Sequence, residues 1–580
     1  MTRTFDRRSL MTLLLPLLLG ALPLRAQDSV IVIDPDAPPV DTLMRGGPPA
    51  DVLAELIAFY NDTATTRLQG DVAFPAGSSF EGRLAVHRGV LRIAGRVHGP
   101  VAVVNGTLRL EEGADVEGDI LVVGGRLIRE AGAVHVGLER VFWDAAPVLR
   151  MPDGVLVIRE RRRPLRELAA ARASFQTGRV RTTLLLATGG TYNRIEGLPI
   201  VFGPTFELRP TARSALKLDL RGILRTAGEG SRLSSDFGYT GRLEYRNGPV
   251  GVAGRFHSEL ETIEDQPLSE GESGWSALLL QRDYHDYFER RGIGASVWAH
   301  PTRALRVELS VRRDHESSVR ATDPWSLFRN SEQWRRNPLV DDGHFLTTAL
   351  EIDYDTRNER DFPSTGWLVQ ARLEHSSSND VAPVVLPTTV RPALPLDDYD
   401  FEHLLLDVRR YSRLTPELRV NARLRAVGWV GGDRLPVQRR VSLGGPDLLP
   451  GYEFRGFTCA PSGFEDRALP ALCDRAVSAQ IEVRTRLGLN LGHRLRDRDG
   501  QPGRFIGIEE ADLVFLTDAG KAWLAGDGPG QVRSNRIPSF DEWKLDVGVG
   551  VDAGAVAAYL AKGVSEGESV KFVVRLQRRF

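Results

Sequence analysis

Residues 477–491, VSAQIEVRTRLGLNL, alternate between two kinds of side chain along their whole length. The odd-numbered positions carry Val, Ala, Ile, Val, Thr, Leu, Leu and Leu, and the even-numbered ones carry Ser, Gln, Glu, Arg, Arg, Gly and Asn. A period of two places successive side chains on opposite faces of a strand. The segment therefore predicts one long strand with an apolar face and a polar face. Residues 307–312, 367–374 and 418–426 alternate in the same way.

Strand length separates a soluble sheet from a membrane barrel, because alternation alone occurs in both. Soluble strands average about five or six residues, whereas strands that span a membrane need about 9 to 11. Many long strands in an exported chain indicate a closed transmembrane barrel, since lipid offers no partner to an open sheet edge. The odd-numbered face of residues 477–491 would then meet lipid, and Arg484 and Arg486 would point into a polar lumen.

The N-terminus indicates export. Arg3, Arg7 and Arg8 precede the apolar run MTLLLPLLLGALPL, and Ala26 offers a small residue for cleavage. Residues 1–26 therefore predict a secretory signal peptide. The Arg pair could direct the twin-arginine route, although an ordinary basic start explains it as well. The apolar run is too short for an ordinary membrane helix, so we expect a bacterial outer-membrane protein without a helical anchor.

Charge and motifs exclude several function classes. The 75 basic and 76 acidic residues give a net charge of -1, and the arginines are scattered, so no nucleic-acid partner is expected. Residues 563–567, GVSEG, match G-x-S-x-G, but the last histidine is His493 and precedes the motif, so the required catalytic histidine is missing. No H-E-x-x-H motif exists. We expect no enzyme, no cofactor and no metal site.

Glycines recur regularly between residues 63 and 140. Gly89, Gly106 and Gly125 lie 17 and 19 positions apart, and Gly99, Gly118 and Gly137 lie 19 and 19 apart. A period near 18 with short runs of Val, Leu and Ile predicts a β-solenoid of about four turns. The stretch GRVHGPVAVVNGTLRLEEGADVEGDILVVGG resembles the bactofilin type of polymer-forming β-helix. A small β-sandwich is the alternative.

The rest of the chain divides around these two patterns. Residues 27–62 contain a linker and a short helix, and residues 141–178 form a basic connector that is either solvated or an amphipathic helix at a membrane surface. Residues 179–580 would form the barrel. About 400 residues, at roughly 25 per strand and turn, predict 16 antiparallel strands. The fold class is all-β, with a solenoid before a transmembrane barrel.

The stretch LGGPDLLPGYEFRGF, residues 443–457, is a costly loop, because its glycines and prolines exclude a helix. It resembles the sixth extracellular loop of the BamA/TamA family, the bacterial surface-antigen barrels. In that family a Gly-Gly pair precedes a tip of apolar residue, Arg, Gly and aromatic residue. Gly444, Gly445, Gly451 and Tyr452 match this pattern, as does Leu449, whereas Pro450 stands in the position of the Arg.

Three further stretches resemble motifs of the same family. YDTRNERDFPSTGW at residues 354–367 is similar to its Asp-x-Arg strand and Pro-x-x-Gly turn, and YNRIEGLP at 192–199 is similar to the start of its barrels. FLTDAGKAW at 515–523, with Asp518 and Gly520, is similar to its Asp-x-Gly strand. The resemblance implies that the loop folds back into the lumen, where its tip Arg docks on a wall that includes this strand.

Because Pro450 replaces the tip Arg, we predict that Arg455 takes over the docking role, against Asp518 or a neighbouring acidic wall residue. Gly451 and Gly456 would permit the return of the loop by adopting positive φ. The alternative is that Arg455 is one of many solvated arginines of the lumen.

The two cysteines, Cys459 and Cys473, follow the loop. An exported protein meets an oxidising compartment, so a disulfide between them is expected, and two free thiols are the alternative.

The C-terminal residues FVVRLQRRF place Phe572, Val574, Leu576 and Phe580 on one face of a last strand. This resembles the sorting signal of bacterial outer-membrane barrels, from which Arg578 departs.

The resemblance leaves two functional hypotheses. The first is a machine that inserts or translocates polypeptides through a seam between the first and last strands. Its partners would be outer-membrane lipid, the barrel assembly machinery during biogenesis and client outer-membrane proteins. The second is a passive pore or structural envelope scaffold, tethered by a periplasmic solenoid. The family's POTRA modules of βααββ pattern are not visible in the sequence, which favours the second hypothesis, whereas the loop and strand motifs favour the first.

Overall fold

The computed structural model describes residues 30–31, 48, 50–143, 146, 148–151, 154–159, 170–188, 192–211, 213–227, 237–264, 268–328, 333–358, 363–384, 398–459, 471–487, 491–496, 502–508, 511–527, 531–554, 556–564, 567–576 and 578–579. They form two compact units, Met1–Pro164 with Arg357–Thr365, and Leu165–Thr356 with Gly366–Phe580. The predicted signal peptide, 1–26, lies outside the described residues.

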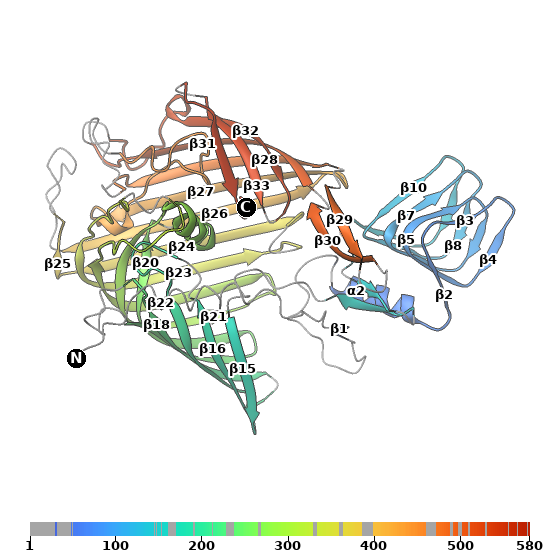
Figure 1. Ribbon diagram of the computed structural model, residues 1–580, viewed down its shortest axis with the longest axis horizontal. Coiled ribbons are helices and arrows are strands. Elements are labelled where there is room, and N and C mark those ends of the chain that lie inside the picture. The colour runs from blue at the N-terminus through green and yellow to red at the C-terminus, as the bar shows by residue number, and fades with distance from the viewer. Residues whose placement is uncertain are drawn as a thin grey trace. The chain divides into compact units, whose positions relative to one another are not determined.

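The first unit contains a β-solenoid with parallel sheets (Figure 1). Successive strands pair at offsets of 17 to 19 residues, as in Leu84 beside Val101 and Val101 beside Ile120. The predicted solenoid is therefore confirmed, and the sandwich alternative is wrong. One sheet contains β2 (Thr65–Gln69), β5 (Arg83–Ile93), β7 (Val101–Leu110), β9 (Ile120–Val123) and β12 (Glu139–Phe142), with β3 (Val72–Phe74) and β10 (Arg126–Arg129) beside it. The other contains β4 (Ser79–Glu81), β6 (Arg96–His98), β8 (Asp115–Glu117) and β11 (Val134–Val136).

Helix α2 (Ala50–Asn61) covers the outer face of the first solenoid sheet. Its Leu53, Leu56 and Tyr60 lie on one helical stripe and pack on outward-facing residues such as Val104 and Val123. The hairpin of β13 (Val148–Arg150) and β14 (Leu156–Arg159), which pairs with β1 (Val30–Ile31), completes this cover. The solenoid thus has a second core outside its own interior.

Two columns of stacked glycines explain the repeat. A Cβ atom on Gly118 would lie 2.5 Å from the carbonyl carbon and oxygen of Gly99 in the turn before it. A Cβ atom on Gly137 would in turn lie 2.4 Å from the Gly118 oxygen. Cβ atoms do not come this close to backbone atoms, so only glycine fits where the turns stack at these corners.

Among the described residues, the second unit is an 18-stranded antiparallel meander whose strands are arranged in chain order. Its strands are β15 (Ala170–Thr177), β16 (Val180–Thr188), β17 (Ile200–Leu208), β18 (Ser214–Leu224), β19 (Phe237–Asn247), β20 (Val250–Ile263), β21 (Asp286–Ala299), β22 (Leu305–Ser318), β23 (Asp342–Asp355), β24 (Gly366–Ser378), β25 (Val381–Ala382), β26 (Tyr399–Arg413), β27 (Leu418–Gly432), β28 (Arg475–Leu487), β31 (Ala511–Trp523), β32 (Lys544–Asp552), β33 (Ala557–Gly563) and β34 (Lys571–Arg575). The remaining elements are α3 (Glu270–Leu280), η2 (Val437–Arg439), η3 (Phe540–Glu542) and a separate hairpin of β29 (Leu491–Arg496) and β30 (Pro502–Ile508).

The strand count differs from the prediction at two places. Without β15 and the two-residue β25, the 18 strands become the 16 that were predicted. β15 lies in the segment assigned to the connector, and the tight turn after Thr177 returns it onto β16. The sheet therefore begins at Ala170 rather than at residue 179.

The sheet is apolar outside and charged inside. On β28, Ile481 is 46% exposed, whereas Glu482 and Arg484 are buried. Arg484 forms ion pairs with Glu482 and Asp552, as expected for a polar lumen, and Arg486 is exposed near the end of the strand. This inverted alternation suits a barrel whose outer surface meets lipid. None of the described helices combines the length and apolar character that a transmembrane helix needs.

Replacing Gly118 by Ala should destabilise the solenoid. The new methyl group has no room against Gly99, and overpacking of this kind costs about 1–3 kcal/mol beyond the strain of positive φ. The measurement is hydrogen exchange of the β7 and β9 amides in the full-length protein. Gly82→Ala is the matched control, because Gly82 also has positive φ (108°) but a Cβ atom there meets nothing within 4 Å. Equal protection in the two variants would contradict the stacking explanation.

The solenoid should also lose stability in mild acid because of His87. Burial of the imidazole, together with Arg88 and Arg150, lowers the pKa of His87 to about 4. In the unfolded chain the pKa of histidine is about 6.5, so between these values only the unfolded state binds the proton. Stability should therefore fall as pH drops from about 6.5 to 4, by at most about 1.4 kcal/mol per pH unit. Hydrogen exchange of β5 measures this.

His87→Phe should flatten that pH dependence. The matched control is His98→Gln, since the side chain of His98 is 39% exposed. If His87→Phe keeps the full dependence, another group causes it.

Candidate functional site

Residues 443–457, LGGPDLLPGYEFRGF, form a loop whose two ends are hydrogen-bonded to each other. The amide of Leu443 donates to the carbonyl of Phe457 and that of Phe457 donates to the carbonyl of Leu443, both at 3.0 Å. Gly444 and Gly445 each have φ of 110°, which turns the chain immediately after this bridge. The loop is therefore one defined unit, which we call the lumen loop. The positive φ predicted at Gly451 and Gly456 is wrong, because the return instead uses Arg455 at φ 55°.

Gly451 is required for close approach. Its amide donates to a carboxylate oxygen of Asp546 on β32 at 2.7 Å, and a Cβ atom on Gly451 would lie 2.5 Å from the amide nitrogen of Gly563 on β33. The hydroxyl of Tyr452 donates to the carbonyl of Leu545 at 3.0 Å. The tip of the lumen loop thus rests on β32 and β33.

Arg455 docks on a wall, but not on Asp518. Its Nε and one terminal nitrogen donate to Glu264 Oε2 at 2.9 and 2.5 Å, and the other terminal nitrogen contacts Asp286. Glu264 follows β20 and Asp286 begins β21. The left-handed backbone at Arg455 directs its side chain to these strands, so the predicted Asp518 partner is wrong.

Asp286 also binds two other arginines. Arg194 and Arg335 both contact its Oδ1, the latter at 2.7 Å, and Arg194 pairs with Asp283 at 3.1 Å. Arg194 is fully buried. It belongs to the quoted YNRIEGLP stretch, so the motif was found in the sequence while its arginine was not singled out.

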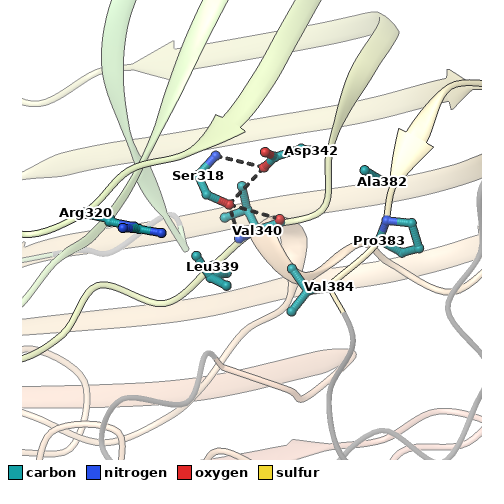
Figure 2. Close-up of a pocket in the computed structure, with 8 residues that line it drawn as sticks. All are labelled: Ser318, Arg320, Leu339, Val340, Asp342, Ala382, Pro383 and Val384. Carbon is teal, nitrogen blue, oxygen red and sulfur yellow. Dashed lines mark hydrogen bonds between the residues drawn. The ribbon is translucent and has the colours of Figure 1, made fainter. Parts of the chain in front are cut away.

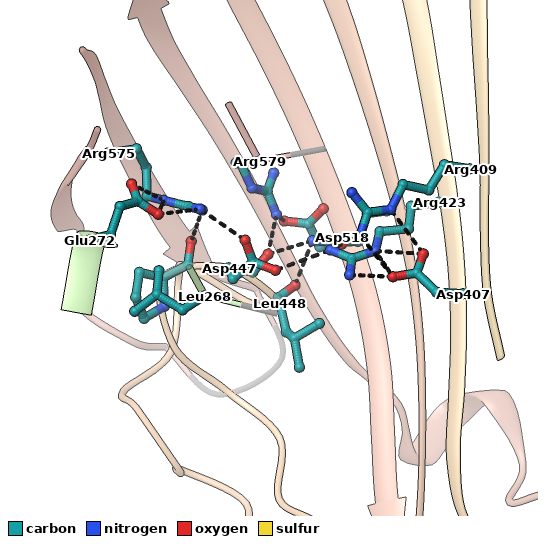
Figure 3. Close-up of polar contacts among 12 residues, drawn as sticks. Leu268, Glu272, Asp407, Arg409, Arg423, Asp447, Leu448, Asp518, Arg575 and Arg579 are labelled. Atoms are coloured by element: carbon teal, nitrogen blue, oxygen red, sulfur yellow. Dashed lines mark hydrogen bonds and ion pairs between the residues drawn. The ribbon is translucent and has the colours of Figure 1, made fainter. Parts of the chain in front are cut away.

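At the start of the lumen loop, Asp447 joins two walls (Figure 3). It pairs with Arg423 on β27 at 3.0 Å and with Arg575 on β34 at 2.9 Å. Arg575 also forms a forked contact with Glu272 of α3, the closer oxygen at 2.9 Å. Burial alone would raise the pKa of Asp447, but the guanidiniums of Arg575 and Arg423 outweigh it and lower that pKa.

The C-terminal residues supply the partner of Asp518. Arg579 donates to Asp518 at 2.6 Å and lies 3.5 Å from Glu482, and all three side chains are fully buried. Arg578 lies 3.3 Å from Asp552. Two adjacent inward-facing arginines cannot belong to an alternating strand, and β34 indeed ends at Arg575.

The prediction that alternate C-terminal residues form one apolar face is confirmed as far as Leu576. Phe572, Val574 and Leu576 are 68, 53 and 39% exposed, whereas Phe580 lies outside the described residues. The departure at Arg578 marks the place where the chain turns inward. The repeated arginines of QRRF were the available signal for this.

The base of the lumen loop is held by the remaining predicted residues. A Cβ atom on Gly520 would lie 2.8 Å from a methyl carbon of Leu443, so the glycine of the Asp-x-Gly strand makes room for the loop. Cys459 and Cys473 lie together with Cα atoms 5.1 Å apart, a spacing typical of disulfides.

A further anchor precedes the lumen loop. Arg439 of η2 pairs with Glu316 on β22 at 2.6 Å and with Glu374 on β24 at 3.1 Å. Together with Asp447 and Arg455, it ties the segment between β27 and β28 to strands on several sides of the lumen. These ion pairs fix the segment against the inner wall of the sheet.

A cavity of about 450 Å³ shares no lining residue with these anchors (Figure 2). It is lined by Ser318, Arg320, Leu339, Val340, Asp342, Ala382, Pro383 and Val384. Ser318 donates through its amide and its hydroxyl to Asp342, both at 2.8 Å. These polar groups hold the last residue of β22 to the first residue of β23, so the cavity lies where strands end and loops begin.

No protein-family model and no curated protein matches the chain. Among solved structures it is similar to BamA from Haemophilus ducreyi lacking POTRA domains 1-3, with 13% identity and a TM-score of 0.37 over 74% of each chain. It is similar to CdiB from Acinetobacter baumannii, with 10% identity and a TM-score of 0.29 over 70% of this chain and 64% of that one. It is also similar to CdiB from Escherichia coli, with 10% identity and a TM-score of 0.29 over 74% of this chain and 65% of that one.

The chain thus spans less than two thirds of either CdiB chain. The family named from the loop motifs is represented among these structures, and at these identities the likeness concerns the fold alone.

Replacing Arg455 by Gln should free the lumen loop. The change leaves Glu264 without its guanidinium, and breaking a buried pair costs about 3–5 kcal/mol. We expect faster proteolysis within residues 443–457 and a higher conductance in planar bilayers. Asp518→Asn should instead remove one ion pair of Arg579, which keeps Glu482 and the Asp447 carbonyl, and leave the lumen loop in place.

Arg209→Gln is the control, since Arg209 pairs with Glu207 at an exposed site. The docking assignment fails if Asp518→Asn frees the loop and Arg455→Gln does not.

Proposed function

We propose that this protein is an outer-membrane barrel that inserts or translocates polypeptides through a seam between its first and last strands. The observation that carries the proposal is the pairing at the ends of the sheet. Among the described residues, β15 pairs only with β16 and β34 pairs only with β33. An unpaired strand edge can form backbone hydrogen bonds with another polypeptide. In lipid, a barrel satisfies these backbone groups by pairing its first strand with its last.

The last strand is also short. Its pairing with β33 comprises Lys571 to Arg575 against Ala557 to Ala561, whereas β20 and β21 pair along all 14 residues of each strand. A strand with few ladder hydrogen bonds separates at a lower cost than a long one. The last strand, which forms one side of the seam, is therefore held to the sheet by few backbone hydrogen bonds.

The lumen supports this proposal over a passive pore. Arg439, Asp447 and Arg455 cross it and are buried in ion pairs with the walls. A water-filled channel would leave such side chains exposed. A polypeptide that passes between the first and last strands does not need an open lumen.

A structural scaffold remains the second candidate, because the last turn of the solenoid is uncovered. Val134, Val136 and Leu138 are 53, 63 and 57% exposed. On either hypothesis we place the solenoid in the periplasm, where such a surface could hold an envelope component.

Depletion of the protein tests the two candidates. If it assists assembly, the outer-membrane proteome should lose other barrels, while inner-membrane and periplasmic proteins keep their levels. Complementation with the wild-type gene should restore them. Unchanged levels of every other barrel, secreted protein and surface protein would reject the transport function and leave the scaffold.

A further inference from the structure

The outer face of β32 defines where the sheet meets lipid. Leu545, Val547, Val549 and Val551 are 40 to 45% exposed and form one row. The side chains between them point inward, as Asp546 shows, because it is fully buried and accepts from Gly451. The odd-numbered residues of this strand therefore face the membrane.

This apolar row continues past the end of the strand. Trp543 precedes β32 in the same odd register, and the ring of Phe540 packs on it with centroids 5.2 Å apart and an interplanar angle of 36°. Phe540 is 84% exposed and Ile537 is 69% exposed, more than any residue of the row. Phe540 is the most exposed large apolar side chain among the described residues.

The exposure of Phe540 is fixed by the local structure. The turn η3 holds it, since the amide of Trp543 donates to the Phe540 carbonyl at 3.1 Å. The indole nitrogen of Trp543 donates to the Pro538 carbonyl at 3.3 Å, and Glu542 pairs with Lys521 at 3.2 Å. A defined turn thus presents Phe540 outward, beside the half-buried Trp543.

Cations lie on the same segment. Arg533 and Arg536 are both exposed, and a turn joins them, in which the amide of Arg536 donates to the Arg533 carbonyl at 2.9 Å. Arginines beside aromatic and apolar anchors are typical of segments that lie in a membrane interface, where guanidiniums meet lipid phosphates.

We propose that residues 533–543, which precede β32, form a lipid anchor at the membrane interface. Ile537 and Phe540 enter the acyl boundary, and Arg533 and Arg536 bind the phosphates of lipid headgroups. The occupant is lipid rather than a protein because Phe540 packs on Trp543, which continues the lipid-facing register of β32, and because two exposed arginines lie on the same segment. The inference does not depend on the transport function.

Spin labelling of the full-length protein in vesicles of phosphatidylcholine and phosphatidylglycerol tests the anchor. A nitroxide on Phe540→Cys should be reached by oxygen more readily than by a water-soluble nickel chelate, as should the lipid-facing control Val549→Cys. Asn379→Cys, on an exposed turn, should give the opposite ratio. The unmodified protein should take up no label, because Cys459 and Cys473 are joined.

Two results would overturn the anchor. A label at position 540 with the nickel accessibility of position 379 would place the ring in water. Protection from both reagents would indicate contact with protein. Heat-modifiable mobility on gels checks that each variant is folded.

The double variant Arg533→Gln and Arg536→Gln tests the headgroup contact. In the anionic vesicles it should reduce the depth of the label at position 540, and in pure phosphatidylcholine the change should be smaller. An equal depth with and without the arginines in anionic vesicles would remove the phosphate contact from the proposal.

Discussion

The contact on which the lumen depends most is the convergence of three arginines on Asp286. Arg194, Arg335 and Arg455 come from three different connections of the meander and meet one fully buried carboxylate at the start of β21. Buried charge is tolerated only when it is paired, so each of these connections is fixed by the position of the others. The lumen is thereby organised by loops as well as by the strand ladder.

Buried ion pairs also fix the last strand of the sheet, β34, and the residues that follow it. Arg575 is held by Glu272 and Asp447, and Arg579 by Asp518, while the edge of β34 away from β33 pairs with no described strand. The strand and the residues after it are thus bound firmly through their side chains, whereas the backbone of the strand pairs along one edge only. Movement at the seam would have to exchange these ion pairs as a group, because leaving one partner buried and alone is costly.

Sequence reasoning recovered the features that depend on local or periodic patterns. Alternation identified the long strands and the lumen position of Arg484, and glycine spacing identified the solenoid. It located the lumen loop, but it placed the return of the loop at Gly451 and Gly456 instead of Arg455 and named Asp518 as the partner of Arg455. Which carboxylate faces a given arginine depends on the register of strands far apart in the chain, as Glu264 shows, and no local pattern records it. The inward turn after Arg575 was missed because one strand was extended to the terminus.

The glycine columns of the solenoid set a rule for how this module can change in length. Each corner glycine lies directly on the equivalent residue of the preceding turn, so a shift by a few residues would bring a side chain onto that backbone. Short insertions are therefore confined to the bends between strands, and the stack grows or shrinks only by whole turns. The length of the solenoid, and therefore the distance that it spans, can change only by the height of a whole turn.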